Sequence, residues 1–375
     1  MTIRIPRHLR SFTAYVPGKP IEEVERQLGI RDAVKLASNE NPLGPSPKAA
    51  EAIRQVAGRV HRYPDGNGYA LRQALAARLA VPAAQIVLGN GSTELVELLA
   101  KAFLADGDGA VVADQAFIMY RIAVAAMAAP LTLVPLRDDR HDLRAMAEAC
   151  DGRTSLVYVA NPNNPTGTYV TRLEMEDYFR RVPPHVLTVL DEAYLDYVEA
   201  ADFPDGLELL KGGKSLAVLR TFSKIHGLAG MRIGYAATLK DVAAALESVR
   251  SPFNTSVPAQ AAALAALGDT AHVARSRTEN ARGARFLQEE LSRRGVGFVP
   301  TVANFLLVRT GVSGEDMHQR LLRLGVIVRP MEAYGYPDGI RVSIGTGEEL
   351  RKFLEALDRV LASPGSPGSA TGRLA

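Results

Sequence analysis

The chain contains a single cysteine, Cys150, and no long uninterrupted apolar run. A lone cysteine excludes an internal disulfide and suits a reducing compartment. The longest apolar stretch, residues 122–136, is interrupted by Pro130 and Pro135 and is too short to span a bilayer. The N-terminus lacks the apolar core of a signal peptide. These absences predict a cytoplasmic protein without a membrane segment.

The chain also lacks a large net charge. The formal net charge is only +3 over 375 residues, so nothing favours a nucleic-acid partner. Hydrophobic residues make up 47% and charged residues 23% of the chain, which is an ordinary balance for a globular protein. The length is sufficient for one large and one small domain.

Short apolar runs alternate with helical patterns in the first two thirds of the chain. Strands are predicted at residues 86–88, 110–113, 156–160, 186–190, 216–219 and 233–236, with helices such as 94–104 and 174–181 between them. This alternation predicts parallel βαβ units. The expected fold class is therefore α/β, with a large domain whose mostly parallel central sheet is flanked by helices.

A second strand and helix pattern occupies the C-terminal third. After Pro258 an alanine-rich helical segment leads to a basic stretch at residues 275–294. Strands or helices then follow at 304–309, 317–324, 326–329, 340–344 and 348–361. We expect a smaller α/β domain formed by residues 271–362 and the N-terminal arm 1–45, beside a large domain of residues 46–270. Residues 363–375, rich in Ser, Pro and Gly, are expected to form a flexible tail.

The segment T-F-S-K-I-H-G-L-A-G-M-R-I-G-Y places Lys224 directly after the apolar run 216–219. A lysine desolvated at a buried strand end has a lowered pKa and becomes a nucleophilic amine that can form a Schiff base with an aldehyde. Ser223, Arg232 and the glycines of the segment suit a phosphate held nearby. The combination suggests a lysine that carries pyridoxal 5'-phosphate (PLP), although an ordinary solvated lysine is the alternative.

Three more motifs each follow a predicted strand. G-N-G-S-T-E at 89–94 opens a helix, whose N-terminus favours an anion. N-P-N-N-P-T-G at 161–167 fixes a loop whose amides can donate to a ligand. D-E-A-Y at 191–194 ends a buried strand with a carboxylate, which requires a cation such as a protonated pyridine nitrogen. Each motif alone is also explained as a turn or a helix cap. Together, at the carboxyl ends of strands, they predict one shared pocket.

These motifs resemble the class II aminotransferases of PLP fold type I, and among them the histidinol-phosphate branch. K-L-A-S-N-E-N-P-L-G at 35–44, H-R-Y-P-D at 61–65 and I-R-V-S-I-G-T at 340–346 match that branch, and the resemblance extends to about residue 361. It implies a PLP-dependent homodimer of histidine biosynthesis. The implied reaction converts histidinol phosphate and 2-oxoglutarate into imidazole acetol phosphate and glutamate, so the partners are small molecules.

The resemblance also implies the residues that hold the cofactor. Lys224 would form the Schiff base and later move the proton. Asp191 would pair with the pyridinium nitrogen, Tyr194 and Asn164 would contact the ring oxygen, and Phe117 would stack on the ring where many relatives have tyrosine. The cofactor phosphate would be held by Gly91, Ser92, Ser223 and Arg232, together with Tyr63 of the neighbouring subunit.

Substrate recognition is expected to rest on Arg329 and Arg341, with Tyr15 and Asn164 completing the pocket. Arginine grips a carboxylate or a phosphate through two parallel hydrogen bonds. One arginine-rich pocket could therefore serve the phosphate of one substrate and the carboxylates of the other, whereas a structural salt bridge is the alternative role. His226 is expected to line the pocket without acting as a base, and no metal site is predicted.

Three other functions stay open at this stage. A decarboxylase of phosphorylated amino acids would share the cofactor motifs, and so would an aromatic or broad-specificity aminotransferase, because fold and cofactor do not fix the substrate. A PLP-binding regulator is disfavoured. Its DNA-binding module would precede the cofactor domain, yet the PLP-type motifs begin by about Lys35.

Overall fold

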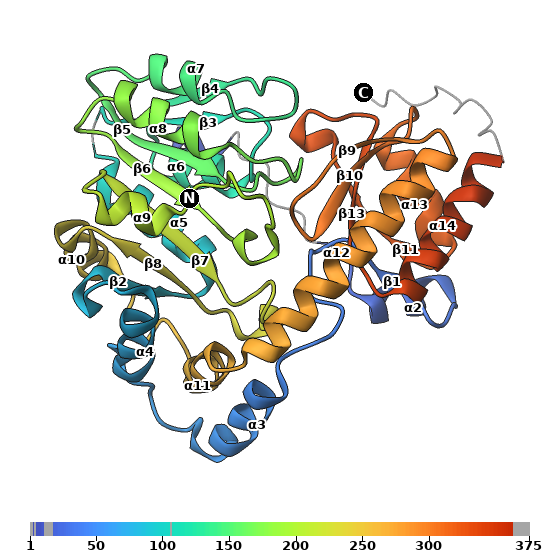
Figure 1. Cartoon of the computed structure of the whole chain (residues 1–375), viewed down its shortest axis with the longest axis horizontal. Helices are drawn as coiled ribbons and strands as arrows, with labels where there is room; N and C mark the ends of the chain where they lie inside the picture. The colour runs from blue at the N-terminus through green and yellow to red at the C-terminus, as the bar shows by residue number, and fades with distance from the viewer. Residues whose placement is uncertain (1–2, 4, 11–17, 106, 363–375) are drawn as a thin grey trace.

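The computed structural model describes residues 3, 5–10, 18–105 and 107–362. These residues form a larger and a smaller body that lie side by side, with the long helix α12 (Thr270–Arg293) running from one to the other (Figure 1). The larger body is built on a seven-stranded sheet. The smaller body contains a four-stranded sheet and a separate two-stranded pair.

The seven-stranded sheet has the order β2-β8-β7-β6-β5-β3-β4. Its strands are β2 (Ile86–Gly89), β3 (Gly109–Ala113), β4 (Leu131–Val134), β5 (Thr154–Ala160), β6 (Leu187–Asp191), β7 (Leu216–Thr221) and β8 (Gly234–Thr238). Neighbouring strands are parallel except at β8, which is antiparallel to both β2 and β7. The mostly parallel sheet is thus confirmed. β8 reverses because only a short 3-10 turn, and no crossover helix, separates it from β7.

Helices cover both faces of this sheet, so most of its strands are buried along their whole length. The helices of the larger body are α3 (Pro47–Val56), α4 (Tyr69–Leu79), α5 (Gly91–Phe103), α6 (Met119–Ala126), α7 (Leu143–Glu148), α8 (Arg172–Arg181), α9 (Gly206–Lys211), α10 (Lys240–Val249) and α11 (Val257–Leu267). A capping box between Thr171 and Glu174 begins α8 two residues before the predicted start. β4, which lies at an exposed edge, was not predicted.

The four-stranded sheet of the smaller body is antiparallel, with the order β12-β13-β10-β9. Its strands are β9 (Gly297–Val299), β10 (Phe305–Arg309), β12 (Arg329–Pro330) and β13 (Gly339–Ser343), and helices α13 (Gly314–Arg323) and α14 (Gly347–Ala362) pack beside it. The single strand predicted at 326–329 is wrong. Residues 326–327 form β11 (Val326–Ile327), which pairs with β1 (Val34–Lys35), and the chain then changes sheets at Val328.

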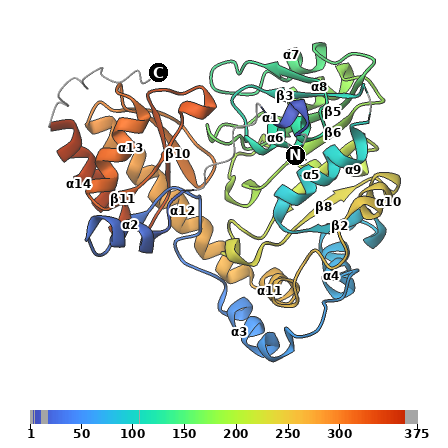
Figure 2. The ribbon, with the colours of Figure 1, turned by 180° about the vertical axis from the view of Figure 1, so that it is seen from behind.

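The N-terminal segment contacts both bodies. Helix α1 (Arg7–Arg10) lies beside α6 on the larger body, which Figure 2 shows from behind. Helix α2 (Ile21–Leu28) instead packs Val24 against Leu322 and Ile327 of the smaller body. The two bodies have separate hydrophobic cores. On this basis we propose the division of the chain into residues 46–270 and residues 271–362 with the arm 1–45.

Short 3-10 turns complete the described chain: η1 (Ala57–Arg59), η2 (Ala83–Gln85), η3 (Leu195–Tyr197), η4 (Ala229–Met231) and η5 (Glu332–Tyr334). None of the helices in the described ranges is both long enough and apolar enough to cross a membrane. The loops that follow β5, β6 and β7 face the smaller body, and this edge of the sheet holds the candidate site.

Candidate active site

A cavity of about 250 Å³ lies between the carboxyl ends of β5, β6 and β7 and the smaller body. Most of the predicted site residues line it together: Ser92, Phe117, Asn164, Asp191, Tyr194, Ser223, Lys224, Arg232, Arg329 and Arg341. The strand-end motifs of the larger body therefore converge on one pocket, as the topology of a parallel sheet requires. The smaller body closes the pocket with its two arginines.

Lys224 reaches the cavity from the loop after β7. Its Nζ donates a hydrogen bond to the carbonyl oxygen of Ser38 at 3.4 Å and lies 5.4 Å from the ring centroid of Tyr194. The loop packs tightly on the N-terminal segment at Gly227, which has a φ of +67°. A Cβ there would lie 2.1 Å from the carbonyl oxygen of Gly44, so a side chain at this position would push the lysine loop away.

Asp191, the last residue of β6, is a buried carboxylate with 6% of its surface exposed. One oxygen accepts from the Tyr120 hydroxyl at 2.8 Å and the other from the Ala193 N–H at 3.1 Å. Burial raises the pKa of Asp191, against the effects of these two donors and of Lys224. None of the ion pairs among the described residues includes this carboxylate. A cationic ring nitrogen in the cavity would match it.

The other end of the cavity is suited to a phosphate. Arg232, held at a φ of +54°, donates to the Ser223 hydroxyl at 3.3 Å and to the Asn90 carbonyl at 3.4 Å. Ser92 lies in the first turn of α5, where N–H groups have no intrahelical acceptor and attract anions. A Cβ on Gly91 would lie 2.4 Å from Arg232 Nη2, so glycine is needed to admit the guanidinium.

Arg329 and Arg341 are direct cross-strand partners on β12 and β13, and both line the cavity. Two cations opposite each other repel unless an anion lies nearby. Arg341 is 7% exposed and donates to the Asn164 side-chain oxygen at 2.6 Å and to the Ala37 carbonyl at 2.8 Å. Its buried Nε has no acceptor among the described residues. An anionic group that enters the cavity would therefore meet both arginines.

Three predicted residues within the described ranges do not line this cavity. Gly91 packs against the guanidinium of Arg232 and so shapes the cavity without lining it. Tyr15, which was also predicted, lies outside the described residues. Tyr63 is 82% exposed and stacks on Phe253, with ring centroids 4.6 Å apart. His226 was expected to line the pocket, and this is wrong. Its ring packs on Phe222 at 5.0 Å, and burial lowers its pKa.

Asn39 and Tyr120 are among the residues of the cavity that the sequence argument missed. Asn39 is 1% exposed, adopts a φ of +55° and donates to the Tyr194 hydroxyl at 3.0 Å. Tyr120 lies in the first turn of α6, and its ring meets that of Phe117 edge to face at 5.6 Å; its place in the same D-Q-A-F-I-M-Y segment could have revealed it. Within the described ranges, no group of His, Cys, Asp and Glu is arranged to hold a metal ion.

Comparisons with known proteins agree with this geometry. A profile of the family described as aminotransferase class I and II matches residues 31–357. Histidinol-phosphate aminotransferase of Moorella thermoacetica is 47% identical over 353 residues, which cover 94% of this chain and 92% of that protein. Histidinol-phosphate aminotransferase 2 of Pseudomonas aeruginosa is 49% identical over 356 residues, covering 94% and 96%.

A solved structure is also similar along the whole chain. Histidinol-phosphate aminotransferase from Sinorhizobium meliloti, in complex with pyridoxal-5'-phosphate, has a TM-score of 0.88 and 30% sequence identity to this chain. The match covers 96% of this chain and 98% of that one.

Asp191 should make the stability of the cofactor-free protein depend on pH. Because the pKa is raised in the folded state, the unfolded chain, with an ordinary pKa of ~3.9, loses this proton first as the pH rises. The contribution of Asp191 to the free energy of unfolding is therefore fully present below the unfolded pKa. It is lost as the pH rises through the folded pKa. Asp191→Asn lacks this loss, so the cofactor-free variant should become the more stable protein at neutral pH.

Urea unfolding of both cofactor-free proteins from acidic to neutral pH measures this difference. Adding PLP should reverse the order, because the native carboxylate then faces a cation. A stability difference between the two proteins that does not change with pH would contradict the assignment of a raised pKa to Asp191.

Proposed function

The chain belongs to the class I and II aminotransferases, and on this premise we propose that it transfers an amino group from histidinol phosphate to 2-oxoglutarate. It is a PLP-dependent enzyme, and the reaction would serve histidine biosynthesis. The names of its curated relatives support this substrate, and so does the chemistry of the cavity. The cytoplasmic location expected from the sequence stays a prediction.

The cross-strand pair of Arg329 and Arg341 is the observation that carries the substrate proposal. Histidinol phosphate has a phosphate and no α-carboxylate, whereas glutamate has two carboxylates. A pair of guanidinium groups can bind either kind of anion through charge-assisted hydrogen bonds. Asn164, which accepts from Arg341 at 2.6 Å, fixes the direction of that guanidinium. The same arginines would thus serve both half-reactions.

The residues at the opposite side of the cavity fit the cofactor. Bound PLP supplies an electron sink for the charge that develops at the substrate's α carbon. Asp191 would hold a proton on the ring nitrogen, and the Tyr120 hydroxyl would keep that carboxylate in place. Ser92, Ser223 and Arg232 would bind the phosphate. Lys224 would hold the cofactor covalently at rest and, once displaced, move the proton at the α carbon.

Assembly into a homodimer is part of the proposal. Large exposed apolar side chains gather near Tyr63 on the larger body, where Val60 is 63% exposed, Tyr69 67% and Phe253 44%. An exposed apolar patch of this kind marks an interaction surface. A second copy of the chain on this surface would receive the Tyr63 hydroxyl at its cofactor phosphate, as the family resemblance implies. Each site would then be built from two chains.

Lys224 should be the residue that bears the cofactor. Borohydride reduction of the loaded enzyme followed by peptide mapping should find the pyridoxyl group on this lysine. Lys224→Ala should keep the fold and some cofactor affinity but lose about 10²- to 10⁴-fold in kcat, the usual contribution of a positioned proton-transfer group. Lys214→Ala is the matched control, because Lys214 lies over the Phe179 ring and does not line the cavity. In this variant the pyridoxyl group should still be found on Lys224. A label on any other lysine would rule out the assignment.

Arg341 should bind the anionic group of both substrates. Arg341→Ala should lower kcat/KM about 10- to 150-fold for histidinol phosphate and for glutamate, because a charge-assisted contact to a desolvated anion contributes about 1.5–3 kcal/mol. Arg329→Ala should affect the phosphate substrate more than glutamate. Arg309→Ala is the control, because Arg309 lies on the neighbouring strand β10, pairs with Asp139 at 3.0 Å and does not line the cavity.

The same assay decides between substrate classes. If the native enzyme prefers histidinol phosphate to histidinol by less than about tenfold, phosphate recognition is worth less than ~1.4 kcal/mol and the aromatic aminotransferase becomes the better proposal. Release of carbon dioxide from a phosphorylated amino acid would favour the decarboxylase.

Composite sites predict complementation between two defective chains. Lys224→Ala removes the chain's own lysine, and Tyr63→Ala removes the group given to the neighbour. Mixing the two variants after mild dissociation should restore about a quarter of native activity, since half of the random dimers would contain one intact site. The assay is run at limiting PLP, where loss of a phosphate contact is most visible. Activity no greater than the sum of the separate variants, or a fully active monomer in sedimentation, would contradict the shared site.

A further inference from the structure

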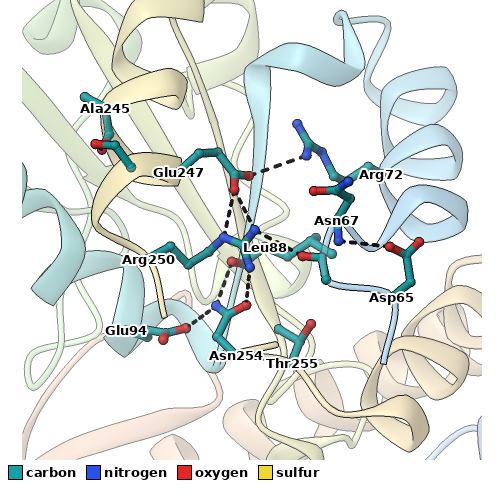
Figure 3. Close-up of polar contacts among 12 residues, drawn as sticks. Asp65, Asn67, Arg72, Leu88, Glu94, Ala245, Glu247, Arg250, Asn254 and Thr255 are labelled. Carbon is teal, nitrogen blue, oxygen red and sulfur yellow. Dashed lines mark hydrogen bonds and ion pairs between the residues drawn. The ribbon is translucent and has the colours of Figure 1, made fainter. Parts of the chain in front are cut away.

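A polar network joins Glu94, in the first turn of α5, to Asn254 and Arg250 (Figure 3). Glu94 turns its carboxylate back to the N–H of Asn90 at 2.5 Å. The same oxygen accepts from the Asn254 side-chain amide at 2.6 Å. The Asn254 side-chain amide also donates to the Leu88 backbone carbonyl at 3.1 Å. The backbone carbonyl of Asn254 accepts from the Asn90 side-chain amide at 3.3 Å. Asn90 is therefore held from two directions.

This arrangement matters because Glu94 is an anion at a helix N-terminus. Such a carboxylate would compete with a bound phosphate for the first N–H groups of the helix. Here Asn254 holds it against the Asn90 N–H, outside α5, which leaves the amides of Ser92 and Thr93 for a ligand. The Asn90 carbonyl, which belongs to the next peptide unit along the chain, accepts from Arg232.

Asn254 is itself fixed by Arg250, whose side chain is 10% exposed. Arg250 donates from Nη1 to the Asn254 side-chain oxygen at 2.7 Å and from Nη2 to the Gly66 carbonyl at 3.0 Å. Its Nε and Nη2 both bind one carboxylate oxygen of Glu247, at 2.8 and 2.6 Å. Figure 3 shows the guanidinium at the centre of these contacts. One arginine thus joins the end of α10 to the loop that precedes α4.

The residue before Asn254 contacts Tyr63. Phe253, at a φ of +57°, stacks on Tyr63 with an interplanar angle of 21°. Residues 253 and 254 therefore hold the exposed Tyr63 and the turn at Asn90, respectively. The proposed function assigns the turn to the phosphate of this chain's own cofactor and Tyr63 to the cofactor phosphate of the neighbouring subunit.

We propose that Asn254, oriented by Arg250, is a positioning residue for cofactor binding: it fixes the turn at residues 90–93 in its phosphate-binding form and couples it to the loop that carries Tyr63. This inference rests on the proposed function, because it takes the phosphate of PLP as the ligand of the turn. It assigns no contact between Asn254 and the cofactor.

The test compares PLP with pyridoxal, which has the same ring and aldehyde but no phosphate. Dissociation constants are measured by absorbance titration of the cofactor-free protein. The near-isosteric Asn254→Asp keeps the acceptor for Arg250 but places a second carboxylate against Glu94. It should weaken PLP binding about tenfold, which corresponds to ~1.4 kcal/mol, and change pyridoxal binding less than about twofold. Asn254→Ala should act in the same direction.

Arg72→Ala is the matched control. Arg72 belongs to the same network through Glu247, at 3.4 Å, and binds the Ala83 carbonyl, but it has no contact with Asn254 or with the turn. Its loss should leave the ratio of the two dissociation constants unchanged. Hydrogen exchange over residues 88–94 of the cofactor-free protein provides a second readout, because Asn254→Asp should speed exchange there whereas Arg72→Ala should not.

The outcomes separate the inference from the proposed function. If the native protein binds PLP and pyridoxal equally well, the phosphate site itself is wrong. If the native protein prefers PLP and both Asn254 variants keep that preference, the function stands and the positioning role is overturned. A loss of both affinities in equal proportion, with a lower melting temperature, would also overturn it, because it would show a purely structural role.

Discussion

Buried charge without a protein counterion is the constraint that organises this structure. Asp191 and Arg341 are 6% and 7% exposed, and no ion pair between them, or with another described side chain, neutralises either one. A buried, uncompensated charge destabilises a fold unless hydrogen bonds or a ligand compensate for it. The Tyr120 hydroxyl and the Asn164 amide supply part of this compensation. Under the proposed function, the remainder comes from what enters the cavity, a cation opposite Asp191 and an anion opposite Arg341.

The hydrogen bonds that stabilise the buried Arg341 come from other parts of the protein. Arg341 belongs to the smaller body, yet it is oriented by Asn164 from the larger one and by the Ala37 carbonyl from the N-terminal segment. Asn39, two residues further, hydrogen-bonds Tyr194 of the larger body and Ser343 of the smaller. The cavity therefore exists only when both bodies and the segment between them are in place. This explains why Gly227, on the loop after β7, is constrained by packing against that segment.

The sequence predicted those parts of the site that follow from local rules. A polar motif after a buried apolar run indicates a strand end, and strand ends of a parallel sheet meet, which brought Lys224, Asp191 and Asn164 together correctly. The antiparallel β8 and the change of sheet at Val328 were missed because strand direction and pairing depend on distant partners. His226 was misplaced for a similar reason. Its position within the lysine motif suggested the pocket, whereas the packing of its ring on Phe222 is a tertiary contact.

The order of charges along the cavity gives a physical account of substrate choice. Arg232 at one end suits the phosphate of the cofactor, Asp191 suits its ring, and the Arg329 and Arg341 pair at the other end suits the substrate. A substrate without an anion would leave the buried Arg341 guanidinium, whose Nε has no acceptor among the described residues, without a counterion. Sites built to pair a charged or polar group reject analogues that lack it far more strongly than apolar pockets reject analogues of altered size. Under the proposed function, Arg341 thus selects substrates mainly by the penalty that it imposes on neutral ones.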